Sequence, residues 1–222
     1  MSRVARIVMP GFPHRVTQRG KRRLQTFFED GGYVHYQKLM AQWCRRYSVA
    51  VWAYCLMPNH VHLIVVPETP QGLHQAVGEA HRRYTRHVNF REGWRGHLWQ
   101  GRFASFVMDE PHLMAALRYV ELNPVRAGLA ERPENYPWSS ARAHVQGTGD
   151  GLVRVEPMRS AVGDWSSFLT VDVQECEMAA LRSHERTGRP LGGAGFLQAL
   201  EAQLGRPLHK RKPGPRGPWK KN

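Results

Sequence analysis

The amino-acid sequence predicts an α+β fold: an antiparallel sheet with helices packed on one face, plus a helical and basic C-terminal extension. Two strand-like runs, 49–57 and 60–67, flank a Pro-Asn turn, which is typical of a β-hairpin. Segments with helical spacing of apolar residues stand on both sides of this hairpin. The 222 residues are enough for one domain with an appendage.

Each predicted element has its own local signal. HRVTQRG alternates as a strand does, and VAVWAYCLM and HVHLIVVP are rich in β-branched and aromatic residues. Asp109 is a good N-cap for the last helix, Pro111 suits its first turn, and Pro124 ends or kinks it. The predicted elements are, in order, a strand (14–20), a helix (27–47), two strands (49–57 and 60–67), a helix (72–92), a strand (104–108) and a helix that begins after Asp109.

This order is the split βαβ plan of ferredoxin-like (RRM-like) folds, in which the second face of the sheet is free for a ligand. The signals divide the chain into a core domain (1–145), a helical extension (146–205) and a basic tail (206–222). In the extension, 175–186 and 195–205 show helical spacing. The tail carries seven Lys or Arg and no acidic residue, so we expect it to be disordered alone and to fold onto a phosphate backbone.

The net charge of +14 and the pI near 10.4 are the strongest compositional signals. Proteins this basic usually bind a polyanion, most often nucleic acid; the alternative is that the charge serves solubility alone. No apolar run is long enough to span a bilayer, and the N-terminus lacks a signal-like segment. Cys44, Cys55 and Cys176 form no CxxC pair, so we expect no zinc knuckle, no disulfide framework and a cytoplasmic location.

Two histidines lie one residue apart at the start of the second hairpin strand. His60 and His62 share a face of this strand, with Cα atoms about 6–7 Å apart, so their imidazoles can converge on one ion while Val61 and Leu63 point into the core. A single strand histidine is usually structural. Two in register are harder to explain in that way, because each buried polar group costs free energy. The pair is therefore a candidate metal site.

Several metal chemistries use a His-x-His pair. Histidine-triad nucleotide hydrolases need a third alternating histidine, but Ile64 stands at that place. Zinc amidohydrolases need further His and Asp ligands at other strand ends, and the sequence offers no convincing set. A two-histidine site with an oxygen ligand suits Mg²⁺ or Mn²⁺ acting on a phosphate, in agreement with the basic composition.

A nucleophile for such a phosphate could come from either of two tyrosines. Tyr84 lies among arginines in HRRYTRHVN, whereas Tyr119 has Asn123 at i+4, on the same helical face. The Asn123 amide could complete a His-His-Asn metal set, and Glu121, at i+2, would point away. Either tyrosine could instead be a core residue. A phenol with a pKa of about 10 needs nearby positive charge to act as a nucleophile, and the Tyr-x-x-x-Asn pairing favours Tyr119.

The motifs MPNHVHLIVVP, LWQGRF and YVELNPVRAG together resemble the single-tyrosine HUH transposases of the IS200-like kind, where HUH denotes His, a hydrophobic residue and His. PGFPHRVTQRGKRR and TGRPLGGAGF resemble the branch of REP-associated tyrosine transposases. The resemblance covers most of residues 6–145 and returns around 187–204. The combination is specific, although any one piece would be weak.

The resemblance implies that His60, His62 and Asn123 hold Mg²⁺ or Mn²⁺ and that Tyr119 is the nucleophile, in a transposase domain spanning 1–145. It implies a bacterial, nucleoid-associated enzyme that cleaves and rejoins single-stranded DNA near palindromic, REP-like hairpins. The intermediate would be a 5′-phosphotyrosine beside a free 3′-OH. Transposon relatives place the tyrosine helix across a dimer, whereas this branch is thought to act as monomers, so the oligomeric state stays open.

Basic side chains outside the metal site are candidates for DNA binding. Each alone is more often a solvated surface charge, but their clustering fits phosphate tracking with a strong salt dependence. The candidates are Arg19, Lys21, Arg22, Arg23, Arg82, Arg83, Arg86 and Arg102.

Two alternatives stay open on the sequence. One is a catalytically silent nucleic-acid-binding module with a ferredoxin-like sheet, a basic tail and a structural histidine pair. The other is a metal-dependent nuclease that uses water and forms no covalent protein–DNA adduct.

Overall fold

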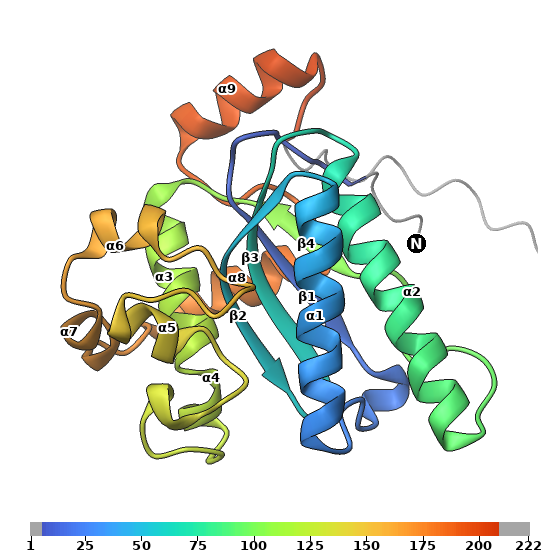
Figure 1. Ribbon diagram of the computed structural model, residues 1–222. Coiled ribbons are helices and arrows are strands. Elements are labelled where there is room, and N and C mark those ends of the chain that lie inside the picture. The colour runs from blue at the N-terminus through green and yellow to red at the C-terminus, as the bar shows by residue number, and fades with distance from the viewer. Residues whose placement is uncertain (1–5, 209–222) are drawn as a thin grey trace, which may run out of the picture.

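The four predicted strands form one antiparallel sheet in the computed structural model, which describes residues 6–208 (Figure 1). The strand order β2-β3-β1-β4 is that of a ferredoxin-like sheet, so the predicted fold class is confirmed. In chain order, the elements of this part are β1 (His14–Arg19), the 3₁₀ helix η1 (Lys21–Arg23), α1 (Asp30–Arg46), β2 (Val49–Met57), β3 (His60–Pro67), α2 (Gly72–Glu92), β4 (Ala104–Val107), α3 (Glu110–Glu121) and α4 (Asn123–Arg126).

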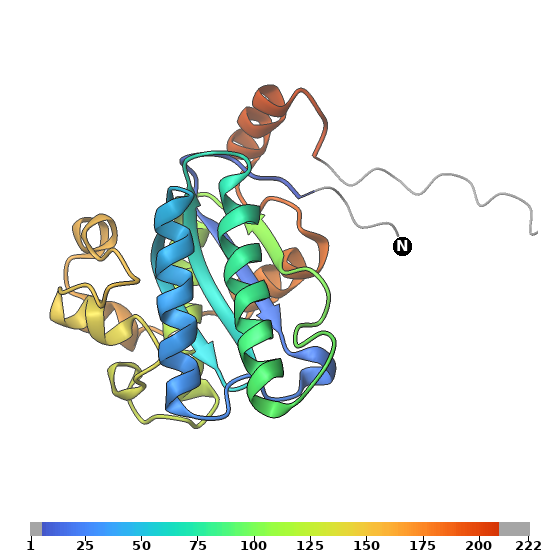
Figure 2. The same ribbon diagram turned by 45° about the vertical axis from the view of Figure 1, so that its right-hand side comes forward.

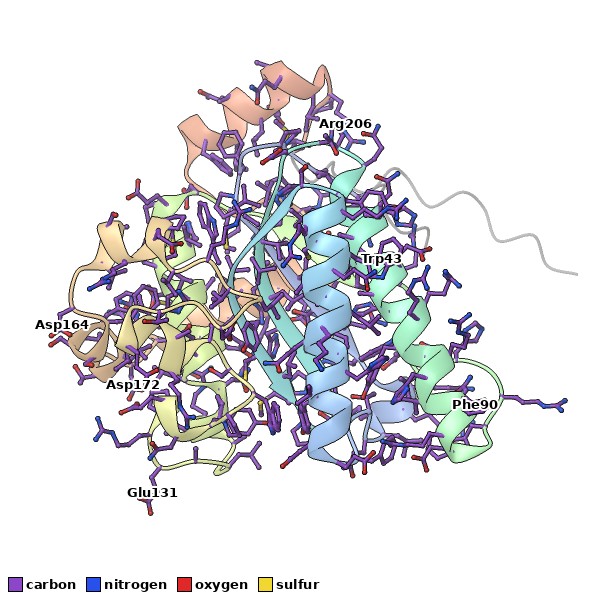
Figure 3. The ribbon with its side chains drawn as sticks, viewed as in Figure 1. Trp43, Phe90, Glu131, Asp164, Asp172 and Arg206 are labelled. Carbon is purple, nitrogen blue, oxygen red and sulfur yellow. The ribbon has the colours of Figure 1, made fainter. Side chains whose placement is uncertain are left out.

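One face of the sheet packs against α1 and α2, which lie side by side in Figure 2. Val61 and Leu63 are buried in this layer, as the period of two along a strand requires. Where the two helices meet, the Arg83 guanidinium lies 4.4 Å from the centre of the Trp43 ring (Figure 3). The apolar layer behind the histidine pair is therefore where the alternation predicts it.

The second face of the sheet packs against α3 and parts of the C-terminal extension, which differs from the free face expected for a ligand. Ile64 and Phe106 join an apolar cluster with residues of α3, α7 and α8. Asp109 caps α3 as predicted, because its side chain accepts a hydrogen bond from the His112 N–H at 3.2 Å. This second face of the sheet is therefore partly covered by helices that follow β4 in the chain.

Helix α3 breaks close to the predicted position. Leu122 (φ −81°, ψ −3°) separates α3 from α4, which begins at Asn123 with Pro124 in its first turn. Proline has no N–H to continue the hydrogen-bond ladder of α3. The Leu122 N–H still donates to the Arg118 carbonyl at 2.9 Å, so Asn123 stays about one helical turn beyond Tyr119.

The extension folds onto the core. The two helices expected there are α8 and α9, and the segment 146–175, for which the sequence assigned no element, forms α6 and α7. Leu191 pairs with Met108 beside β4. Most of the predicted tail, 209–222, lies outside the described residues. The elements of this part are η2 (Pro133–Asn135), α5 (Ala141–Gln146), α6 (Glu156–Val162), α7 (Trp165–Thr170), α8 (Glu175–Thr187) and α9 (Ala194–Leu204).

Within residues 6–208, no helix combines the length and the apolar character needed to cross a membrane.

Gly20 ends β1 where it meets the β2–β3 turn, and its N–H donates to the Asn59 carbonyl at 2.8 Å. A Cβ atom at this position would collide with the Leu24 carbonyl oxygen and lie 2.7 Å from Cγ2 of Thr26. We expect Gly20→Ala to lower the free energy of unfolding by about 1–3 kcal/mol, because the backbone of the following loop must move.

Gly195, inside α9, is the matched control for Gly20, since a Cβ atom added there would meet nothing within 4 Å apart from its chain neighbours and the backbone of its own helix. Gly195→Ala should leave the stability unchanged or raise it by up to about 1 kcal/mol, because alanine favours helix. Urea unfolding measures both variants, and equal effects would contradict the close packing at Gly20.

Two buried histidines link stability to pH. Burial lowers the pKa of His14 to about 4 and that of His81 to about 3. Ring nitrogens of both are hydrogen-bonded, to the Phe12 carbonyl at 2.8 Å and to the Tyr36 hydroxyl at 2.8 Å. In the unfolded chain each histidine takes up a proton near pH 6.5. The folded state binds fewer protons, so these groups lower the stability as pH falls from about 6.5 toward the folded pKa values, and have no effect above.

We expect His81→Phe to reduce the slope of unfolding free energy against pH by about 1.4 kcal/mol per pH unit between about pH 6 and pH 4. The readout is a series of urea unfolding curves over this range. The exposed His74 supplies a control, since His74→Ala removes a histidine whose environment folding barely alters. An unchanged slope in His81→Phe would mean that His81 is protonated in the folded protein.

Candidate active site

The pairing of β1 with β3 assembles one polar face. In the antiparallel register, Arg19 lies opposite His60 and Thr17 opposite His62. Residues opposite each other in an antiparallel pair point to the same face of the sheet, so Arg15, which is opposite Ile64, joins them. This is the face that packs against α3, away from α1 and α2.

The two imidazoles lie close together with a free nitrogen each. Their ring centres are 4.7 Å apart and the rings are perpendicular. Nδ1 of His60 lies 2.6 Å from Oδ1 of Asn59, and Nδ1 of His62 lies 3.4 Å from the Thr17 hydroxyl. In the described part of the chain, neither Nε2 atom takes part in a hydrogen bond. Both Nε2 atoms are therefore available to a ligand on this face.

The environment of the pair favours neutral rings. Burial, with the nearby cations Arg19 and Arg15, lowers the pKa of His60 to about 4. Burial and the Arg15 guanidinium hold the pKa of the fully buried His62 well below its usual value. A neutral imidazole keeps one lone pair, which a metal ion needs, so both rings have the charge state that can bind a metal ion at neutral pH.

Tyr119 of α3 lies beside His62 and close to two arginine side chains. Its ring meets the His62 ring edge-on, with 5.8 Å between the ring centres. The Arg15 guanidinium lies 4.7 Å and the Arg126 guanidinium 4.5 Å from the centre of the Tyr119 ring. Arg126 also donates a hydrogen bond to the Tyr119 carbonyl oxygen. The phenol is thus held where positive charge can stabilise negative charge on its oxygen.

Arg15, Arg126 and Glu185 are site residues that the sequence analysis did not identify. Arg15 is fully buried, donates to Glu185 of α8 at 2.9 Å and lies 3.3 Å from Nδ1 of His62. Glu185 also lies 3.8 Å from Arg19. The alternation of HRVTQRG could have indicated Arg15, because it shares a strand face with Arg19. Glu185 belongs to a distant helix and had no local signal.

The donors present fit a divalent metal ion. Two neutral imidazoles with free Nε2 atoms suit Mn²⁺, and an amide oxygen is an acceptable further ligand. Asn123, half-buried at the start of α4, stands about one turn beyond Tyr119. No group of three or more His, Cys, Asp or Glu in the described residues could hold a metal. Asn123, the further ligand that the sequence suggests, is an amide and lies outside these residue types.

Glu121 points away from the histidines, as its position at i+2 from Tyr119 predicts. Its carboxylate is completely buried and accepts hydrogen bonds from the Ser140 hydroxyl at 2.5 Å and the Trp165 indole N–H at 2.7 Å. Nδ1 of His144 lies 2.6 Å from the same carboxylate. The end of the tyrosine helix is therefore anchored by residues that follow it in the chain.

The other candidate tyrosine has a structural role. Tyr84 is fully buried among the aromatic side chains of α1 and α2, with Phe27 and Tyr36 at ring-centre distances of 5.3 and 5.2 Å. Its hydroxyl donates to the Thr26 carbonyl at 2.9 Å, and burial raises its pKa. It lies on the opposite side of the sheet from His62.

The predicted DNA-binding residues fall into two groups. Arg19, the exposed η1 residues 21–23 and the exposed Arg102 lie near the His60 end of the sheet, where Gln100 donates to the Arg19 carbonyl at 2.8 Å. The arginines 82, 83 and 86 are on α2, on the other side of the sheet. Arg82 pairs with Glu79 there at 2.7 Å. The structure thus brings only the first group close to the histidines.

Comparison with known proteins agrees with this geometry. Residues 13–123 match the model of the family described as "Transposase IS200 like". A protein of Haemophilus influenzae (strain ATCC 51907 / DSM 11121 / KW20 / Rd), named as a REP-associated tyrosine transposase, is 27% identical over 116 residues. That match covers 47% of this chain and 66% of the relative, just under two thirds of its length.

A solved structure of a REP-associated tyrosine transposase bound to a REP hairpin is similar to this chain with a TM-score of 0.57 and 21% identity. The similarity covers 70% of this chain and 90% of that chain, and at this identity it supports the fold alone. The matched range 13–123 covers half of the chain and contains His60, His62, Tyr119 and Asn123. The chain therefore belongs to the family of IS200-like transposases.

Proposed function

We propose that this protein cleaves and rejoins single-stranded DNA next to palindromic hairpins, with Tyr119 as the nucleophile. The observation that carries the proposal is the position of the Tyr119 ring, edge-on to His62 and within 5 Å of the guanidiniums of Arg15 and Arg126. Membership of the transposase family supplies the class of reaction. Tyr84, the alternative nucleophile, is buried in the core with its hydroxyl bonded to a backbone carbonyl.

The reaction that fits this arrangement is a transesterification. The Tyr119 oxygen attacks the phosphorus of the scissile phosphodiester, a bond from this oxygen to phosphorus forms, and the bond from phosphorus to the 3′ oxygen breaks. The phenol loses its proton and the leaving 3′ oxygen gains one, so no water is consumed. The 5′-phosphotyrosine keeps the energy of the phosphoester, and a second 3′-OH end can reverse the step and be joined.

The arginines near Tyr119 would provide electrostatic stabilisation of the transition state. The positive charges of Arg15 and Arg126 would stabilise the negative charge that develops on the phenol oxygen and the phosphate, most strongly at the fully buried Arg15. His60, His62 and Asn123 would hold Mg²⁺ or Mn²⁺, which would add positive charge at the scissile phosphate. The family match includes all three of these residues.

The proposed substrate is a hairpin with adjoining single-stranded DNA. The solved relative binds a REP hairpin, and the net charge of +14 suits a polyanion. Arg19 lies beside His60, and we propose that it contacts the strand entering the site together with Arg102 and the η1 residues 21–23. The arginines 82, 83 and 86 on α2 could contact only DNA that extends around the sheet.

We expect Tyr119→Phe to lose strand cleavage and the covalent adduct while binding hairpin DNA as tightly as the wild type. The phenol oxygen is the atom that forms the new bond, and the ring that packs against His62 is retained. The assay uses end-labelled hairpin DNA with a single-stranded flank and Mn²⁺, followed by denaturing electrophoresis.

Tyr84→Phe is the matched control for this assay, because it also removes one hydroxyl from a buried helical tyrosine. It should cost only about 1 kcal/mol of stability and keep the adduct. Cleavage by Tyr119→Phe without an adduct would instead indicate a nuclease that uses water. Hairpin binding without cleavage by the wild type, with Mn²⁺ bound, would indicate a silent DNA-binding module.

We expect His60→Ala to weaken Mn²⁺ binding by at least about 100-fold, since loss of an outer-shell partner alone costs about 10–100-fold. Binding is followed by electron paramagnetic resonance of free Mn²⁺, and cleavage should fall in parallel. His74→Ala, which removes an exposed histidine from α2, should leave both unchanged. Wild-type Mn²⁺ affinity in His60→Ala would exclude the metal site.

A further inference from the structure

The β2–β3 turn and the basic loop that follows β1 are joined by a set of backbone hydrogen bonds. The Gly20 N–H donates to the Asn59 carbonyl, and the Thr26 and Phe27 N–H groups both donate to the Pro58 carbonyl, over 2.8–3.1 Å. This loop contains η1, whose residues are exposed. The turn that presents His60 is therefore built against the loop that carries three of the proposed DNA contacts.

The side chain of Asn59 bridges the two parts. Its amide nitrogen Nδ2 donates to the Arg23 carbonyl at 3.1 Å, and its oxygen Oδ1 lies 2.6 Å from Nδ1 of His60. A backbone carbonyl only accepts hydrogen bonds, so the Arg23 carbonyl must face the NH₂ group of the amide. This settles which end of the amide is oxygen, a choice that the shape of the side chain alone leaves open.

The orientation of the amide then decides the tautomer of His60. An amide oxygen only accepts, so Nδ1 of His60 must carry the proton that it donates to Asn59. In the neutral ring, the other nitrogen, Nε2, is left with the lone pair and can bind a cation. The Arg23 carbonyl therefore selects, through Asn59, the tautomer of His60 that can act as a metal ligand.

His62 has different neighbours at its Nδ1 atom. Its Nδ1 lies 3.4 Å from the Thr17 hydroxyl, which can donate or accept, and 3.3 Å from the Arg15 guanidinium, which can only donate. Because the guanidinium must donate to Nδ1, Nδ1 carries the lone pair and the proton of the neutral His62 ring lies on Nε2, the opposite arrangement to that of His60. His62 can thus serve as an internal comparison for His60 in the same protein.

The loop that supplies the Arg23 carbonyl is held in an unusual backbone conformation. Arg22 and Arg23 both have positive φ, 56° and 62°, which residues other than glycine rarely adopt. Such strain persists where the surroundings enforce it, and it concentrates at functional sites. Here the contacts of Gly20 and Asn59 enforce it, while both arginine side chains stay exposed.

We propose that Asn59 is a positioning residue that couples the conformation of the basic loop 20–24 to the tautomer of His60. When the Arg23 carbonyl accepts the hydrogen bond from Asn59, the amide keeps one orientation and Nε2 of His60 is unprotonated. When the Arg23 carbonyl moves away, the amide can turn over and present its NH₂ group to His60, which favours the other tautomer. This inference rests on the proposed metal role of His60, but its central statement concerns the metal-free protein.

The decisive experiment is nitrogen NMR of histidine-labelled, metal-free protein at pH 7.5, in which protonated and unprotonated ring nitrogens have well-separated shifts. We expect His60 in the wild type to carry its proton on Nδ1. Asn59→Ala should lose this preference and give a mixture of tautomers. Asn59→Asp keeps an acceptor for Nδ1–H and should restore it. A wild-type tautomer in Asn59→Ala, or an Nε2–H tautomer in the wild type, overturns the proposal.

Two further measurements separate coupling from a merely structural role. Arg23→Ala keeps the backbone carbonyl, so it should weaken hairpin binding while leaving the His60 tautomer and Mn²⁺ affinity as in the wild type. Asn59→Ala should weaken Mn²⁺ binding about 10–100-fold, and Asn59→Asp should recover affinity. Equal Mn²⁺ affinity in Asn59→Ala and the wild type overturns the coupling.

The tautomer result is independent of the proposed function. If His60→Ala leaves Mn²⁺ binding intact, the proposed metal site is excluded. The nitrogen shifts of His60 in the wild type and in Asn59→Ala would still test whether Asn59 sets its tautomer. If Asn59→Ala keeps the wild-type tautomer of His60 in a protein that still cleaves DNA through Tyr119, only the role of Asn59 is withdrawn.

Discussion

The register between β1 and β3 is the constraint on which the rest of the molecule depends. Strand side chains alternate with a period of two, so one pairing decides both faces of the sheet at once. In the observed register, Val16 lies opposite Leu63 in the apolar layer under α1 and α2, while Thr17 lies opposite His62 on the other face. A slip of one residue in β1 would bury Arg15 among apolar side chains and move Val16 to the histidines. Packing of the hydrophobic layer therefore sets the strand register, and the register sets the positions of the site residues on the opposite face.

The charge distribution around Tyr119 follows from the same pairing. Arg15 approaches the Tyr119 ring because β1 carries it to the face that α3 covers. Glu185 from α8 offsets part of this charge, while the guanidinium of Arg126 also lies close to the Tyr119 ring. Burying an arginine without a carboxylate partner would cost several kcal/mol, so the extension makes a fully buried Arg15 tolerable. A strongly basic chain thus uses one of its few acidic residues at the centre of its site.

Local patterns allowed most of the core to be predicted, and long-range contacts set the limit. Alternation, capping residues and turn signals predicted all four strands and the helices α1, α2 and α3 close to their bounds, because these signals act within about ten residues. HVH and the Tyr-x-x-x-Asn spacing indicated side chains that the fold brings together, His62 and Tyr119. The approach of Arg126 and Glu185 had no such signal, since it depends on how α4 and α8 pack. Charge alone selected Arg82 and Arg83, but it could not tell which side of the sheet α2 covers.

The carboxylate of Glu121 has a consequence for the limits of the folding unit. The family match ends at residue 123, yet the groups that bind this carboxylate are Ser140, His144 and Trp165. A chain cut at the end of the match would lose these partners together with the segments that cover the foot of the helix that bears Tyr119, so we expect it to be less stable. The segment that matches the family and the segment that folds as one unit are therefore not the same. What a family model detects is the chemistry, and what keeps that chemistry in place is a longer stretch of chain.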